Sequence, residues 1–225
     1  MRAGSRAAPP PRGKRHLPRA RTRGSASSAG DLAHVAVADI PAVFEATAGY
    51  RARVGAFAAW LGLSVRWDLL LVPGGHAYRG GVVAALCDAL RPWMALHDVA
   101  HWLVAPTWRK RRTNFGLGAA PQVHRREAPS RVLVSTRHAR AEETAAAVLT
   151  IFLAWDLLDG DAAESATLGH DGMRGYDASE NRFTEAGYER WEAVLRKRGL
   201  IDGENRSPLV ARFRSEARES GGTCR

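Results

Sequence analysis

Two histidines four residues apart, His97 and His101, are the residues of this sequence whose types and spacing are best suited to chemistry. They stand in the segment "HDVAHW", where Asp98 directly follows the first histidine. Side chains at positions i and i+4 share one face of a helix, with Cβ atoms about 5–6 Å apart. Two imidazole nitrogens can then approach one metal ion. The pattern differs from the zinc-protease motif H-E-x-x-H in having an aspartate in place of the glutamate.

A firm metal site needs a third ligand, and the segment "RAEETAAAVLTIF" offers two carboxylates, Glu142 and Glu143. Both stand where a second apolar helix is expected to begin. Negative charge is stabilised at a helix N-terminus, so one of the two has a structural explanation without a metal. Two histidines and one carboxylate can bind zinc or form the three-ligand face of non-haem iron enzymes. The alternative is a histidine pair that is only hydrogen-bonded in the core, but two on one face with acids nearby favour a metal.

The residues around and after the histidine pair resemble the family of the elongation factor P hydroxylases. That family's signature has the form H-E-x-x-H-W, then a basic pair, then an acid-Phe-Gly step. The resemblance covers about residues 90–155 of this chain. The matching residues are His97, Asp98, His101, Trp102, Arg109, Lys110, Asn114, Phe115 and Gly116.

This resemblance implies a mononuclear metal-dependent monooxygenase that modifies a protein side chain. Its metal ligands would be His97, His101 and Glu142, with Glu143 as the alternative third ligand. The metal would be iron, with zinc as the alternative, and the substrate a translation elongation factor or another protein. Contacts to the substrate or partner would come from Arg109, Lys110, Phe115 and Gly116. The sequence departs from the family at Asp98 and in "NFGLG", which replaces a more aromatic continuation.

Asp98 favours oxidative chemistry over hydrolysis. In a hydrolase of the H-E-x-x-H type, the glutamate lies beside the metal-bound water and acts as general base. Aspartate is one methylene shorter, and a misplacement of about 1 Å can lower a rate about 10²-fold. An oxygen-activating metal does not need that base, so we expect Asp98 to support catalysis by orienting a ligand imidazole. Pairing of Asp98 with a neighbouring base such as Arg91 is the purely structural alternative.

Two other functions remain open on the sequence. "ALHDVAHW" also resembles phosphohydrolases of the HD type, which need an upstream histidine and a downstream aspartate. His76, with Asp156 or Asp161, could fill those roles, although His76 stands in a glycine-rich segment. The third function is non-catalytic: a metal-stabilised interaction protein whose basic segments bind a partner.

The elements that must position the ligands are two buried helices, 92–104 and about 141–158, which would pair as in the zincins. Pro92 suits the first turn of a helix, and Pro106 ends the first one. Helical periodicity also predicts helices at 40–63, 81–90 and 185–198, and short strands are expected in "WDLLLVPGG" and "RVLVST". We therefore predict a single domain that is mainly α, or α+β with a small amount of strand.

Charge divides the chain into segments. The net charge is +10, but residues 1–30 hold eight basic residues and no acid, and the remaining 25 basic residues nearly balance the 23 acidic ones. We predict a disordered basic arm at 1–30 that can bind nucleic acid weakly, a metal-binding helical domain at 31–205, and a frayed tail at 206–225. Alternatively, residues 1–30 are an organellar targeting segment, or the start codon is misassigned. Two distant cysteines and the lack of a long apolar run predict a cytoplasmic protein without a membrane span.

Overall fold

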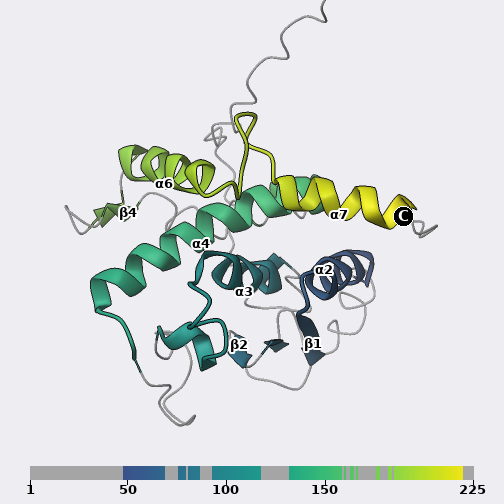
Figure 1. Cartoon of the computed structure of the whole chain (residues 1–225), viewed down its shortest axis with the longest axis horizontal. Helices are drawn as coiled ribbons and strands as arrows, with labels where there is room; N and C mark the ends of the chain where they lie inside the picture. Colours follow the sequence, from purple (N-terminus) through teal and green to yellow (C-terminus); the bar gives the residue numbers. More distant parts are fainter. Residues whose placement is uncertain are drawn as a thin grey trace, which may run out of the picture.

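The computed structural model describes residues 48–68, 76–79, 81–86, 93–117, 132–158, 160, 163–164, 166, 176–177, 182–183 and 185–219. The basic head, the first part of the predicted 40–63 helix and Asp161 lie outside these residues. In the part that is described, the chain is mainly α-helical with two small sheets, as predicted (Figure 1).

Two buried helices, α3 (Trp93–Val104) and α4 (Thr136–Leu157), pack against each other at the centre of the fold (Figure 1). Helix α3, and α4 from Thr144 onward, are apolar around most of their circumference, so these parts are covered by other elements. The hydroxyl of Ser135 accepts a hydrogen bond from the backbone N–H of His138 at 3.2 Å and caps the first turn of α4. This cap makes α4 begin at Thr136 and not near position 141 as predicted. The two glutamates at 142 and 143 consequently lie in its second turn.

A three-stranded sheet lies beside these helices. Strand β3 (Val82–Leu86) is central, with β1 (Ser64–Asp68) parallel to it and β2 (His76–Arg79) antiparallel. The predicted helix at 81–90 was wrong for its described part, because Val82–Leu86 is a strand. A short apolar run cannot be assigned to a strand or a buried helix by periodicity alone, and the adjacent valines at its start favour the strand.

Helices α2 (Ala48–Trp60) and α7 (Pro208–Glu219) pack together on one side of the core. The ring of Phe213 lies 5.5 Å from that of Phe57 and 6.0 Å from that of Trp60, centroid to centroid. The prediction of a frayed tail from residue 206 was wrong for this segment, since α7 buries Val210 and Phe213.

Helix α6 (Glu185–Lys197) ends at Gly199, whose φ of +67° suits a glycine after a helix end. This confirms the helix predicted at 185–198, although it is not the last one, because α7 follows it. A two-stranded sheet of β4 (Tyr176–Asp177) and β5 (Arg182–Phe183) precedes α6. Residues 132–135, where a strand was expected, form the bend that leads to the Ser135 cap. No helix among the described residues is long and apolar enough to cross a membrane.

Candidate metal centre

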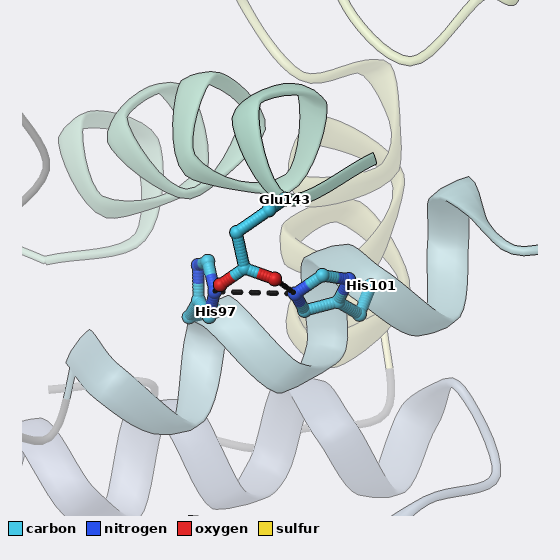
Figure 2. Close-up of side chains that lie close together, drawn as sticks. All are labelled: His97, His101 and Glu143. Atoms are coloured by element: carbon cyan, nitrogen blue, oxygen red, sulfur yellow. Dashed lines mark hydrogen bonds and ion pairs between the residues drawn. The ribbon is translucent and has the colours of Figure 1, made fainter. Parts of the chain in front are cut away.

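Three side chains converge between α3 and α4: His97 and His101 from α3 and Glu143 from α4 (Figure 2). The Nε2 atoms of the two imidazoles lie 3.2 Å apart. Oε1 of Glu143 lies 3.0 Å from Nε2 of His97, and Oε2 lies 3.0 Å from Nε2 of His101. Both histidines are buried, whereas the Glu143 side chain is 42% exposed. The cluster is therefore open to solvent on the Glu143 side.

The separations of these atoms match those of ligands on one small cation. Zinc lies about 2.0–2.1 Å from histidine nitrogens and carboxylate oxygens. Two such bonds that meet at the ion at an angle of about 90–109° place their ligand atoms roughly 3–3.4 Å apart. The observed separations of 3.0 and 3.2 Å fall in this range. The donor set, two imidazoles and one carboxylate, suits zinc or non-haem iron. These three residues can hold a metal ion.

The orientation of His97 is set from behind by Thr150 on α4. The Thr150 hydroxyl donates its proton to the carbonyl of Ala146 at 2.7 Å. Its oxygen lies 3.4 Å from Nδ1 of His97, and toward this nitrogen it can only accept. This contact favours a proton on Nδ1 of His97, which leaves Nε2 free to bind an ion once its own proton to Glu143 is lost.

The orientation of His101 is set by a buried ion pair. Nδ1 of His101 lies 3.9 Å from Oε1 of Glu142, and neither atom has a hydrogen-bond partner in the structure. The other carboxylate oxygen of Glu142 accepts from the guanidinium of Arg109, whose Nη1 also donates to the carbonyl of Phe115 at 3.2 Å. His138 Nε2 lies 3.5 Å from the same Glu142 oxygen, on the exposed side. A carboxylate behind Nδ1 favours the tautomer that frees Nε2 for the metal.

The two glutamates thus have different positions from those expected. The sequence prediction put Glu142 first and Glu143 second as the third ligand. The structure places Glu143 against both Nε2 atoms and turns Glu142 toward Arg109. Neighbouring residues on a helix point about 100° apart, as 3.6 residues per turn require, so the two carboxylates cannot face the same point.

The loop after α3 holds the other side of His101. Phe115 stacks on the His101 ring with centroids 5.5 Å apart, and Tyr78 stacks on Phe115 at 4.1 Å. Asn114, Phe115 and Gly116 all have positive φ, at 43°, 52° and 70°. Left-handed backbone costs roughly 1–2 kcal/mol for a residue with a side chain. Strain of this kind concentrates at functional sites, where the surrounding structure maintains it.

Three of the four residues expected to contact a substrate are buried. Arg109 is 1% exposed and Phe115 is 2% exposed, and Gly116 is also buried. Their places in the structure are behind the histidines and inside the loop. Lys110 alone is partly exposed, with Nζ 3.8 Å from the centre of the Trp102 ring.

Electrostatics couple Glu143 to His101. Burial is the largest effect on His101 and disfavours its charged form, but the Glu143 carboxylate, with Glu142 and Asp98, raises its pKa to about 10. Burial also disfavours charge on Glu143, but the charge of His101 and the hydrogen bonds from both imidazoles lower the pKa of Glu143. Without a metal, the Glu143 carboxylate stabilises a proton on His101. A cation that binds at the cluster must displace that proton.

The remaining candidate residues lie apart from the cluster. Asp98 is buried beside His97, but its carboxylate is not one of the converging ligand atoms. Asp156 accepts hydrogen bonds from the backbone N–H of Ser207 and from Arg206, at the start of α7. It lies 13 residues after Glu143 on α4, which is about 20 Å along the helix axis. His76 is in β2, and its side chain lies outside the described part.

Sequence reasoning missed Thr150 and Tyr78. The position of Thr150 could have been inferred from the sequence, because it stands seven residues after Glu143 and therefore on the same face of α4. No sequence pattern predicts the stacking of Tyr78 on Phe115, because the two residues are 37 positions apart and their contact depends on how the sheet packs.

No protein-family model, no curated protein and no solved structure matches this chain.

Proposed function

We propose that this protein is a mononuclear metal enzyme of the hydroxylase type, with His97, His101 and Glu143 as the metal ligands. When bound, iron at this site supplies oxygen-activating chemistry. The observation that carries the proposal is the convergence of two Nε2 atoms and one carboxylate within 3.0–3.2 Å. The resemblance of "HDVAHW" and the loop after it to the elongation factor P hydroxylases supports an oxidative reaction on a protein side chain.

The residues of the chain hold the ligands in place in this proposal. Thr150 and Glu142 orient the two imidazoles from behind, so that both present unprotonated Nε2 to the same point. Phe115 covers one face of His101 and keeps water from it. The two helices then act as a zincin-like pair, with the carboxylate of Glu143 on the open side, where a substrate side chain can approach.

Oxidation is preferred to hydrolysis because the residue at the general-base position of the motif is an aspartate and not a glutamate. In hydrolases with two histidines at this spacing, the residue after the first histidine activates the metal-bound water. Asp98 occupies that position and is one methylene shorter than glutamate, so it would stand back from a metal-bound water. Iron with two histidines and one carboxylate keeps open positions for oxygen and needs no such base.

The phosphohydrolase alternative lacks support from Asp156. That carboxylate binds Ser207 and Arg206, and its distance along α4 keeps it away from His97 and Asp98. Asp161 and the side chain of His76 lie outside the described residues, so this alternative is addressed by experiment.

The test combines metal content with oxygen consumption. The full chain is loaded with Fe(II) or Zn(II) under anaerobic conditions, freed of excess metal, and analysed by mass spectrometry. We expect about one ion per chain, and loss of most of it in His97→Ala, His101→Ala and Glu143→Ala. His138→Ala is the matched control, because this histidine is 57% exposed and lies outside the cluster. Full metal occupancy in either α3 histidine variant would contradict the proposed ligand set.

Oxygen consumption then separates the enzyme from its alternatives. The iron-loaded protein with ascorbate as reductant should consume oxygen faster than His97→Ala treated in the same way. Metal binding without oxygen consumption would favour the metal-stabilised interaction protein. Turnover of p-nitrophenyl phosphate by the zinc- or manganese-loaded protein would favour the phosphohydrolase.

A further inference from the structure

The turn after α3 and the end of α6 form one basic surface that the metal centre does not use. The two segments meet where Nη2 of Arg198 donates to the carbonyl of Val104 at 2.8 Å. Lys110 stands in the turn that follows Val104, and burial, together with the charge of Arg198, lowers its pKa. We call this the basic surface, and its members are Trp108, Lys110, Arg111, Arg112, Lys197 and Arg198.

The charge of this surface is not balanced locally. The sequence has no Asp or Glu at 105–117 or at 193–201. Arg111, Arg112 and Lys197 are exposed, and no ion pair within the described ranges neutralises them. By contrast, exposed Arg212 on α7 has an acidic partner, Glu216, at 2.6 Å. Five positive charges on two adjoining segments create a positive potential that attracts polyanions.

An exposed indole stands among these cations. Trp108 is 60% exposed, whereas Trp93 of α3 is 6% exposed. Cζ of buried Arg109 lies 5.8 Å from the centre of the Trp108 ring and supports it from the protein side. Exposed aromatic rings within a basic groove are the stacking platforms of proteins that bind single-stranded nucleic acids. An acidic peptide would use the cations but would have no need of the ring.

We propose that the basic surface binds single-stranded nucleic acid, with phosphates on the arginines and lysines and a base stacked on Trp108. This inference stands apart from the proposed function, because none of the surface residues is a metal ligand. Binding would bring nucleic acid, or a partner that carries it, to the face next to the C-terminal end of α3.

The experiment measures binding of a fluorescent twelve-nucleotide poly(U) RNA to the full chain by anisotropy. The double variant Arg111→Glu/Arg112→Glu should bind about tenfold or more weakly, and raising salt from 50 to 200 mM should weaken wild type much more than this variant. The matched control is Arg137→Glu/Arg218→Glu, which makes the same charge change at exposed positions on α4 and α7. It should bind like wild type, and it retains the basic head.

Trp108→Ala tests the stacking part of the proposal. It should weaken poly(U) binding about tenfold, within the range for loss of one stacked base, and leave binding of inorganic polyphosphate unchanged. Equal losses in the two double variants would overturn the proposal and assign binding to overall charge. Competition by poly-glutamate as effective as that by RNA would overturn it in favour of an acidic protein partner. Circular dichroism of each variant confirms that it is folded.

Discussion

The hydroxyl of Thr150 lies 3.4 Å from Nδ1 of His97 while it donates its proton to Ala146, 2.7 Å away. Because that proton is already used, the oxygen accepts from His97 and fixes which ring nitrogen faces the metal cluster. Partners of this kind behind a metal ligand typically change affinity or activity by about 10–100-fold when removed.

Thr150→Val should therefore weaken metal binding by roughly 10–100-fold. Valine has nearly the shape of threonine but cannot accept from Nδ1, so His97 loses the contact that selects its tautomer. Affinity is measured by competition with a chromophoric zinc chelator. Thr150→Ser keeps the hydroxyl and should retain near wild-type affinity. Equal weakening in the serine and valine variants would mean that packing, and not hydrogen bonding, is responsible.

The buried pair of Arg109 and Glu142 gives a prediction on stability. Arg109→Met leaves the buried Glu142 carboxylate without its guanidinium partner and should destabilise the protein by about 3–5 kcal/mol in urea denaturation. Replacing both partners, as Arg109→Met/Glu142→Met, removes the uncompensated charge and should recover most of that loss.

The same double variant separates folding from metal binding. Because Glu142 lies behind Nδ1 of His101, metal affinity should stay low even where stability returns. Recovery of both properties together would show that the pair is only structural.

The sequence was sufficient to predict what depends on local periodicity. His97 and His101 share a face because they are four residues apart on an apolar helix, and α3, α4 and α6 follow from their apolar patterns. Residues 208–219 also carry a helical pattern, with Val210 and Phe213 on one face, but their charged neighbours concealed it in the sequence.

Contacts between distant segments could not be predicted in this way. The choice between Glu142 and Glu143 depends on the rotation of α4 about its axis, which packing against α3 decides. Arg109 belongs to a basic run, which predicts exposed side chains. Only its pairing with the buried Glu142 explains why this one arginine is buried. The secondary structure of the apolar run at 81–90 could not be predicted for the same reason, because pairing of its first part with β1 and β2 makes that part a strand.

Gly116 provides a prediction on the strained loop. A Cβ at this position would lie 2.7 Å from Cδ1 of Leu133, and φ is +70°. Gly199 has almost the same backbone, with φ of +67°, but a Cβ there would have no neighbouring atom within 4 Å. Gly199→Ala should cost roughly 1–2 kcal/mol from the left-handed backbone alone, and Gly116→Ala should cost more, as measured by urea denaturation. Gly116→Ala should also weaken metal binding, because it displaces Phe115 from the His101 ring, whereas Gly199→Ala should not.

The metal-free protein should lose stability as the pH rises from about 6.5 to 10. The folded pKa of His101 is raised from 6.5 to about 10, so its contribution is complete below pH 6.5 and disappears as pH passes through 10. The pKa of Glu143 is lowered from 4.5, so its contribution is present above pH 4.5 and is lost in acid. Thermal melts in chelator, compared with Glu143→Gln, measure this dependence, which the variant should flatten.

Metal binding should show the opposite dependence on pH. A metal ion requires unprotonated Nε2 on His101, so binding releases a proton and becomes tighter as the pH rises over the same interval. Zinc titrations in two buffers of different ionisation enthalpy detect that proton. Binding that is independent of pH between 6.5 and 9 would place His101 outside the ligand set.

Asp98 gives the last prediction, on the type of reaction. If the protein were a hydrolase, Asp98 would be a general base set back by one methylene, and Asp98→Glu should then raise turnover of casein peptides or p-nitrophenyl phosphate. We expect no hydrolysis in this variant, because the oxidative reaction proposed for this site needs no general base at position 98. Asp98→Ala should loosen the metal by about 10–100-fold without abolishing binding, as expected for a residue that supports a ligand. Glu143→Ala should remove most of the metal and Glu142→Ala less, since only the first removes an atom that faces both imidazoles. A new peptidase or phosphatase activity in Asp98→Glu would reverse the assignment and make hydrolysis the reaction of this site.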